Sequence, residues 1–220
     1  NVKIERIDKM KRGFNIPNVF ISLLLLATGL WALIEGFLGI FSNLYLITTG
    51  GIGYWVLGGD LKSLIRPIKK RQILFIIRIL LFSYVLSLTV FELSDHFLHM
   101  PSSDNPVIHQ LSWITPFEKI PGLFGEEMLV IVLLVILEHY LPKNRTGLII
   151  ASILSSLLFG AAHLSTYDWN VWQSLVVIGL TRIPFTYAWY KSDRNLLVNG
   201  FAHWGYDMLI FILAIAYGNA

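Results

Sequence analysis

The stretch "LFGEEMLVIVLLVIL" (residues 123–137) places two adjacent carboxylates, Glu126 and Glu127, at the head of an apolar run. The residues that follow them, 128–137, are all uncharged. An ionisable side chain at the centre of a bilayer costs at least ~2.5–3.5 kcal/mol on insertion scales, and such residues usually face a bundle interior or a wet cavity. The stretch therefore predicts a membrane helix whose carboxylates serve a function.

The composition of the whole chain also indicates a lipid bilayer as its surroundings. The 220 residues are 55% hydrophobic and only 14% charged, whereas soluble domains carry about 25% charged residues. The absence of cysteine excludes disulfides and thiolate metal sites. The chain has no basic patch that would indicate nucleic acid as a partner. The polar, basic first 17 residues predict that the first apolar run is an uncleaved transmembrane helix rather than a signal peptide.

Apolar runs recur on both sides of residues 123–137. A helix needs about 20 mostly apolar residues to cross the hydrocarbon core. The sequence therefore predicts an all-α, polytopic bundle of about seven spans, of which the second is short and rich in glycine (Gly50, Gly51 and Gly53). The predicted spans are 18–41, 43–57, 73–98, 123–141, 146–164, 170–190 and 196–217.

The basic residues alternate between the two sides of such a bundle. Cytoplasmic loops are rich in Lys and Arg. The N-terminal arm and the loops after the second, fourth and sixth spans carry 14 of the 17 basic residues. The opposite side holds only Lys119, while Arg78 and Arg182 lie inside spans. We therefore predict a cytoplasmic N-terminus, an outer C-terminus and a location in a bacterial cytoplasmic membrane.

No repeat or domain boundary interrupts the chain, so we interpret 1–220 as a single membrane domain. Residues 17–116 would hold the N-terminal spans and an outer loop, and residues 117–220 a catalytic four-helix core. The outer loop contains Pro101, Pro106, Pro116 and Pro121. We expect a short interfacial segment there, with Trp113 and Phe117 at headgroup level, and further belt residues at Trp169, Trp172, Trp189 and Tyr190.

Several ionisable residues lie inside the predicted spans. Glu35 lies deep without an evident partner, and Arg78 is close enough to the cytoplasmic end to reach the interface. Glu92, Asp95 and His96 lie near the outer end of the third span, where water is accessible. The charges of the last four spans differ, because a rise of about 1.5 Å per residue places all of them in the outer half or near the midplane. These are Glu126, Glu127, His163, His203 and Asp207.

The spacing of these residues suggests hydrolytic chemistry. Phe159 and His163 in "FGAAH", like His203 and Asp207 in "HWGYD", are four residues apart and share a helix face. A poorly solvated carboxylate is suited to act as a general base. A histidine held by a polar partner can stabilise a developing oxyanion. The set suffices for water-driven amide hydrolysis without a covalent nucleophile.

In order along the chain, these motifs resemble those of the CAAX-protease and bacteriocin-processing (Abi) family of intramembrane proteases. The resemblance covers roughly residues 125–213. It implies that Glu126 and His163 activate water and that His203 and Asp207 form the oxyanion-stabilising pair, with no cofactor. It also implies a peptide or membrane-protein substrate, because family members cleave prenylated CAAX tails, process bacteriocins or peptides, confer immunity or regulate surface proteins.

One position departs from the family pattern. The first motif usually carries Arg five residues after the first Glu, and Ile131 stands there. Adjacent residues on a helix point about 100° apart, so we interpret Glu127 as structural. We predict that Arg182, at comparable depth in the sixth span, supplies the missing cation. The same departure favours the alternative function, a non-proteolytic membrane scaffold or immunity protein that binds a partner membrane protein.

Other chemistries fit the sequence less well. The HExxH motif of zincins is absent, since Glu138-His139 has the reverse order. GxSxG is absent too, and the pairs Tyr167-Asp168 and Tyr206-Asp207 have no GxGD partner. A zinc site formed by the four catalytic candidates is chemically possible. A proton-relay transporter would use the same charges, but no inverted repeat supports it, and interhelical hydrogen bonding is the simplest alternative for any single polar residue.

Overall fold

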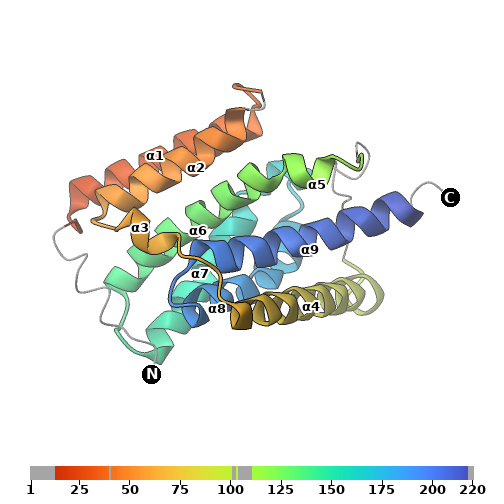
Figure 1. Ribbon diagram of the computed structural model, residues 1–220. Coiled ribbons are helices and arrows are strands. Elements are labelled where there is room, and N and C mark those ends of the chain that lie inside the picture. Colours follow the sequence, from red (N-terminus) through yellow and green to blue (C-terminus); the bar gives the residue numbers. More distant parts are fainter. Residues whose placement is uncertain (1–12, 40, 101–102, 104–110, 218–220) are drawn as a thin grey trace.

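The computed structural model describes residues 13–39, 41–100, 103 and 111–217 (Figure 1). The basic N-terminal arm and two prolines of the outer loop, Pro101 and Pro106, lie outside them. All regular structure in the described ranges is helical, which confirms the all-α class. The elements are α1 (Ile16–Ile34), α2 (Phe41–Val56), α3 (Leu61–Leu64), α4 (Lys70–Glu92), η2 (Leu93–Phe97), α5 (Thr115–Glu118), α6 (Ile120–Tyr140), α7 (Arg145–Ala161), η4 (Ser165–Tyr167), η5 (Gln173–Leu180), α8 (Ile183–Lys191) and α9 (Leu196–Tyr217).

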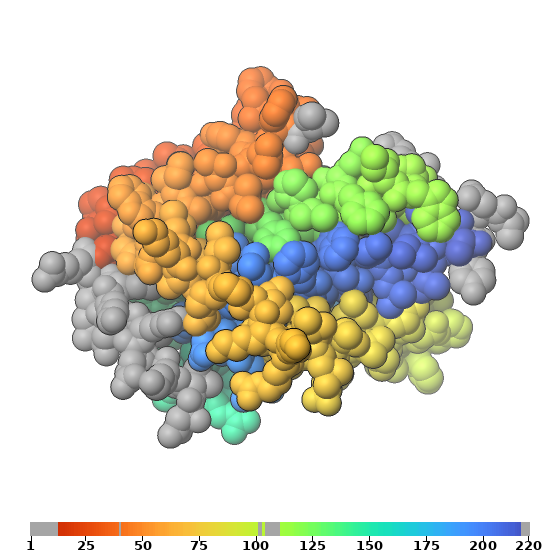
Figure 2. Space-filling view, in the orientation of Figure 1, coloured from red at the N-terminus to blue at the C-terminus, as the bar shows by residue number. Residues whose placement is uncertain are grey.

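Helix α6 forms the centre of the bundle. It contacts α2, α7 and α9. In the segment Thr115–Tyr140, which includes α6, 72% of the most apolar stretch is buried inside the protein. The α1–α2 hairpin packs on one side of it, and α4 lies at the opposite edge of the molecule against α8 and α9 (Figure 1). In the space-filling view, α9 runs between α4 and the α5–α6 segment (Figure 2). The helix that carries the two glutamates is therefore the most enclosed of the long apolar helices.

Within the part of the chain that the structure describes, four helical segments are long and apolar enough to cross a membrane, which identifies a multi-pass membrane protein. They are Ile16–Ile34, Lys70–Phe97, Thr115–Tyr140 and Leu196–Ala216. Only 11% of the most apolar stretch of Lys70–Phe97 is buried inside the protein, so most of the surface of this helix is available to contact lipid. The other predicted spans correspond to the shorter helices α2 and α7 and to the η5–α8 pair. The seven-span count and the orientation therefore stay predictions.

The sixth predicted span, 170–190, is wrong as a continuous helix. The chain forms a π-helix, η5, to Leu180 and then starts a new helix, α8, at Ile183. The reason is Pro184 in the first turn of α8, because inside a continuous helix its ring would clash with the carbonyl four residues earlier, that of Leu180. The break places Arg182 at the N-cap of α8, deep in the bundle.

The first predicted span is too long. Helix α1 ends at Ile34, because Gly36 and Gly39 adopt positive φ angles of 60° and 56°. Glu35 is therefore the exposed C-cap of α1 rather than a deep, unpaired charge. The belt position predicted for Trp189 is also wrong, since its side chain is 1% exposed and belongs to the core.

Glycine allows the α1–α2 hairpin to approach α6. A Cβ atom on Gly50 of α2 would lie 2.8 Å from Cβ of Met128, and one on Gly125 of α6 would lie 3.0 Å from the Leu46 side chain. The first distance is shorter than carbon atoms tolerate, and the second would require the Leu46 side chain to shift, so both glycines favour this close approach of the helices. Small residues commonly have this role between membrane helices, and Gly50 in particular allows α2 to pack closely against α6.

Candidate functional site

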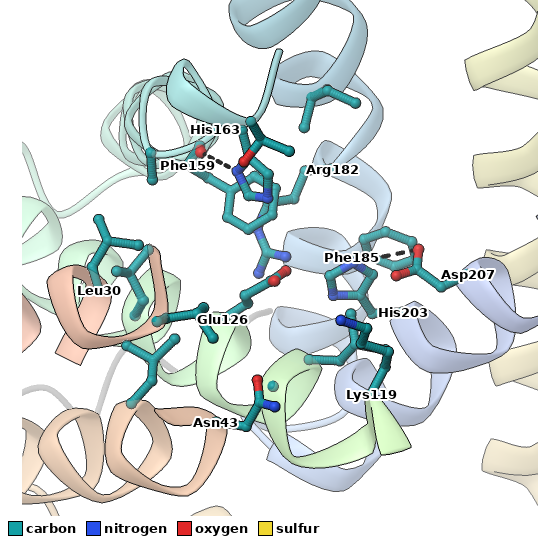
Figure 3. A pocket seen from close by; sticks show the side chains of 18 of the residues that line it. Leu30, Asn43, Lys119, Glu126, Phe159, His163, Arg182, Phe185, His203 and Asp207 are labelled. Atoms are coloured by element: carbon teal, nitrogen blue, oxygen red, sulfur yellow. Dashed lines mark hydrogen bonds and ion pairs between the residues drawn. The ribbon is translucent and has the colours of Figure 1, made fainter. Parts of the chain in front are cut away.

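The two glutamates of α6 face different surroundings. Glu127 is fully buried, whereas Glu126 is half-buried and lines a cavity of about 510 Å³. The same cavity is lined by His163 after α7, by Arg182 at the start of α8, and by His203 and Asp207 of α9 (Figure 3). The structure therefore brings together all four residues that the sequence predicts as catalytic, from three separate helical segments.

The Glu127 carboxylate is held by donors from two other segments of the chain. Arg182 donates from Nη1 to Oε1 (2.7 Å) and from Nη2 to Oε2 (2.8 Å). His203 Nδ1 contacts Oε1 at 2.8 Å, and Asn199 Nδ2 donates to Oε2. These four contacts occupy the four lone-pair sites of a carboxylate. Glu127 is thus a structural anchor with no free site for water, and its predicted pairing with Arg182 is confirmed.

The position of Ile131 agrees with this arrangement. Its side chain is 1% exposed and belongs to the apolar core around α6. The cation that pairs with Glu127 comes from the η5–α8 junction instead, where the guanidinium of Arg182 also lies 4.5 Å from the centroid of the Phe159 ring. A bidentate, fully buried pair of this kind is strongly destabilised when one partner is removed, because the other charge is left uncompensated.

His203 is oriented mainly by Glu127, not by Asp207 as the sequence suggested. A carboxylate only accepts hydrogen bonds, so Nδ1 carries a proton at its 2.8 Å contact with Glu127. The other ring nitrogen, Nε2, lies 3.9 Å from Oδ1 of Asp207, which is too long for a hydrogen bond. Spacing of four residues within α9 revealed the nearer neighbour in sequence but not the partner from α6.

Aromatic rings fix the imidazole from the side. The ring of Phe185 on α8 stacks on His203, with centroids 4.9 Å apart and planes inclined by 27°. The ring of Phe159 meets His203 edge-on at 6.3 Å and lies 4.5 Å from the ring of His163. Phe159 and Phe185 are both buried. Both histidines therefore have little freedom to turn within the cavity.

His163 has a defined tautomer. It lies just beyond the end of α7, and its Nδ1 is 2.9 Å from the carbonyl oxygen of Phe159. A carbonyl oxygen only accepts, so Nδ1 is the donor and Nε2 of the neutral ring keeps its lone pair. The FxxxH spacing thus has a direct structural reason, since the backbone of the first residue orients the ring of the last. His163 can accept a proton or a hydrogen bond from water at Nε2.

Glu126 differs from Glu127 in having no hydrogen-bond or ion-pair partner among the described residues. It projects from α6 into the cavity together with Leu123 and Leu129, and its surroundings are mostly apolar. A carboxylate with free acceptor sites that shares a cavity with a histidine whose Nε2 is free can hold and deprotonate a water molecule. The described part of the chain contains no group of three or more His, Cys, Asp or Glu side chains arranged for a metal ion.

Sequence reasoning missed two residues that build the site. Asn199 is 1% exposed and precedes His203 by one helical turn, and both contact Glu127. Phe185 stacks on His203 from α8. The sequence did contain a signal for Asn199, because it stands four residues before His203 on an apolar helix and so shares its face. Nothing in the sequence links Phe185 to the site, because only the break at Arg182 turns it inward.

The segment that contains this site matches a known protein family. Residues 110–209 match the family model described as Type II CAAX prenyl endopeptidase Rce1-like. Searches of curated proteins and of solved structures give no match. The matched segment contains all of the cavity's glutamate, histidine and aspartate residues described above. Over residues 110–209 the chain is therefore similar to the Rce1-like, CAAX prenyl endopeptidase family, the family that its motifs resemble.

Proposed function

We propose that the protein is an intramembrane endopeptidase that hydrolyses a peptide bond with water activated by Glu126 and His163. The observation that carries this proposal is the contrast between the two neighbouring glutamates. Glu127 has four donors, whereas Glu126 faces the cavity together with His163. A base with free acceptor sites that faces a cavity is what hydrolysis by water requires.

The reaction can be written from the geometry of the cavity. Glu126 takes a proton from a water molecule whose second hydrogen is bound by Nε2 of His163. The water oxygen attacks the scissile carbonyl carbon, and the resulting oxyanion accepts a hydrogen bond from protonated Nε2 of His203. Asp207, 3.9 Å from that nitrogen, stabilises the imidazolium electrostatically. Glu126 then gives its proton to the leaving nitrogen as the C–N bond breaks.

The proposal includes a membrane setting. The chain would cross a bacterial cytoplasmic membrane seven times with its N-terminus inside, so that the cavity opens toward the outer side. Its substrate would be a peptide or a segment of a membrane protein. The residues around Glu126 support an extended, largely apolar peptide, because Leu30, Leu123 and Leu129 line the same cavity.

Substitution of Glu126 by Gln tests the mechanism. The amide keeps the shape of the side chain but cannot take a proton, so kcat should fall by about 10²–10⁴-fold, the range typical for loss of a general base. Glu118→Gln is the matched control, because Glu118 is exposed on α5 and outside the cavity. The measurement is cleavage of a peptide library by the purified variants.

Two results would contradict the proposal. Equal cleavage by wild type and Glu126→Gln would exclude Glu126 as the base. Absence of cleavage, combined with a cellular phenotype that survives both Glu126→Gln and His163→Ala, would favour the alternative of a non-proteolytic scaffold or immunity protein that binds a partner membrane protein.

A further inference from the structure

The mechanism leaves two polar side chains of the cavity without a role. Lys119, at the N-cap of α6, and Asn43, on α2, both line the cavity (Figure 3). Both are half-buried. Within the described residues, neither the ammonium group of Lys119 nor the side-chain amide of Asn43 has a hydrogen-bond or ion-pair partner. Unpaired donors that line a mostly apolar cavity indicate a binding site for an acceptor.

The helix geometry places both groups relative to Glu126. Lys119, Gly122 and Glu126 are spaced i, i+3 and i+7 and line the cavity along one face of α6. Gly122 leaves room for the Asn43 side chain, since a Cβ atom there would lie 2.4 Å from Asn43 Oδ1. Asn43 thus packs one turn from Glu126, and Lys119 lies about two turns, or roughly 10 Å, from it along the axis.

We propose that Lys119 and Asn43 form a carboxylate-binding subsite for the substrate peptide. An extended peptide advances about 3.3 Å per residue, so a carboxylate at this subsite would lie about three residues from the bond positioned at Glu126. The carboxylate can come from an acidic side chain or from a free C-terminus, which share the same chemistry. The inference rests on the proposed function for the identity of the ligand as a peptide.

Charge favours this assignment. The other cation of the cavity, Arg182, is already neutralised by Glu127, whereas Lys119 carries the one unpaired permanent positive charge among the cavity-lining residues described. Glu126 and Asp207 line the same cavity and repel a carboxylate from the reacting centre. An anionic substrate group is therefore attracted to the Lys119 end and oriented with its neutral peptide bond toward Glu126.

Peptide binding can be measured without turnover in the Glu126→Gln variant. The probes are fluorescent, apolar peptides with a single Glu placed at successive positions, and matched peptides with Gln instead. Each is made with a free and with an amidated C-terminus, which separates the two sources of the carboxylate. Anisotropy of the purified protein in detergent should show about tenfold tighter binding of one acidic peptide over its neutral match, as a charge-assisted hydrogen bond supplies.

Variants of the subsite show whether Lys119 causes this preference. Lys119→Gln should abolish it, Lys119→Arg should retain it, and Lys119→Glu should shift the preference to a peptide with Lys at that position. Asn43→Leu should weaken it. Lys70→Gln is the matched control, because Lys70 is exposed and begins α4, away from the cavity. Unchanged unfolding temperatures exclude a merely structural effect.

The two proposals fail in different ways. Equal binding of acidic and neutral peptides, or a preference that survives Lys119→Gln, overturns the subsite whatever the enzyme cleaves. A preference that depends on Lys119, without cleavage of the same peptide by the protein that retains Glu126, supports the subsite and contradicts the hydrolase. With active protein, Lys119→Gln should raise KM for the acidic peptide about tenfold and leave kcat unchanged.

Discussion

Two neighbouring residues of one helix have opposite roles, and their directions explain the difference. Glu127 points into the protein, where Arg182, His203 and Asn199 donate to it. Glu126 points into the cavity, because adjacent side chains on a helix point about 100° apart. Burial of a carboxylate requires such donors. The free carboxylate is therefore the one available for chemistry, while its neighbour fixes the surrounding helices.

The pair formed by Glu127 and Arg182 can be tested by a double-mutant cycle. Each single substitution by Ala should lower the free energy of unfolding by about 3–5 kcal/mol, because it leaves the other charge buried and uncompensated. The double variant should lose much less than the sum of the two. The measurement is equilibrium unfolding in detergent.

A distant pair provides the control for this cycle. Glu138 forms its own buried ion pair with Arg194 (2.8 Å) and lies roughly 16 Å along α6 from Glu127. Arg182→Ala combined with Glu138→Ala should therefore give additive losses. Additive losses for the Glu127 and Arg182 pair as well would show that the two residues do not interact.

At the scale of elements, the contact between α7 and η5 positions His163 and Arg182 relative to each other. A Cβ atom on Gly160 would lie 2.3 Å from the backbone oxygen of Ser174, and one on Gly179 would lie 3.0 Å from that of Ser156. Backbone atoms cannot rotate away, so any side chain at Gly160 separates the two elements. His163 follows Gly160 by three residues, and the site therefore depends on this contact.

Gly160→Ala should reduce catalysis more than it reduces folding. Overpacking of this kind costs typically about 1–3 kcal/mol of stability, whereas a displacement of about 1 Å at a catalytic group can cost about 10²-fold in rate. Gly51→Ala is the control, because nothing lies within 4 Å of the added carbon. Peptide cleavage and thermal unfolding are measured side by side, and a variant with full activity would refute this role of the contact.

At the scale of the whole molecule, the bundle encloses α6 and leaves α4 at its edge (Figure 1). Large apolar side chains of α4, among them Leu81, Phe82 and Val85, are more than half exposed. Such a surface is suited to lipid and unsuited to water. The cavity, by contrast, is built where α6, the end of α7, the η5–α8 junction and α9 meet. A cavity lined by ionisable side chains inside a lipid-facing bundle follows from this arrangement.

The predicted topology can be tested directly, because the chain contains no cysteine. A single cysteine at Lys62, exposed on α3, should be inaccessible to a membrane-impermeant maleimide in intact bacterial cells. One at Glu118, exposed on α5, should be labelled. Both positions should react after the cells are lysed. The reverse pattern in intact cells would invert the orientation, and labelling at both positions would place the two loops on one side.

The fraction of this structure that the sequence predicts depends on how local each feature is. Helix α9 begins and ends where the apolar run predicts, at Leu196 and Tyr217, since length and composition alone specify a span. The broken sixth span was missed because a Pro in an apolar run reads as a tolerated residue. Asn199 and Phe185 were missed because each contacts a residue of another helix. Asn199 of α9 donates to Glu127 of α6, and Phe185 of α8 stacks on His203 of α9.

The sequence by itself determined an all-helical membrane protein and indicated which ionisable residues line its cavity. It could do so because burial of a charge in an apolar run is costly wherever that run packs. It also determined the pairing of Phe159 with His163, which is set by one turn of helix. Only the tertiary structure decided which glutamate is free, because the donors to Glu127 come from α8 and α9. Contacts between segments far apart in the chain depend on the packing of helices, and no local pattern records them.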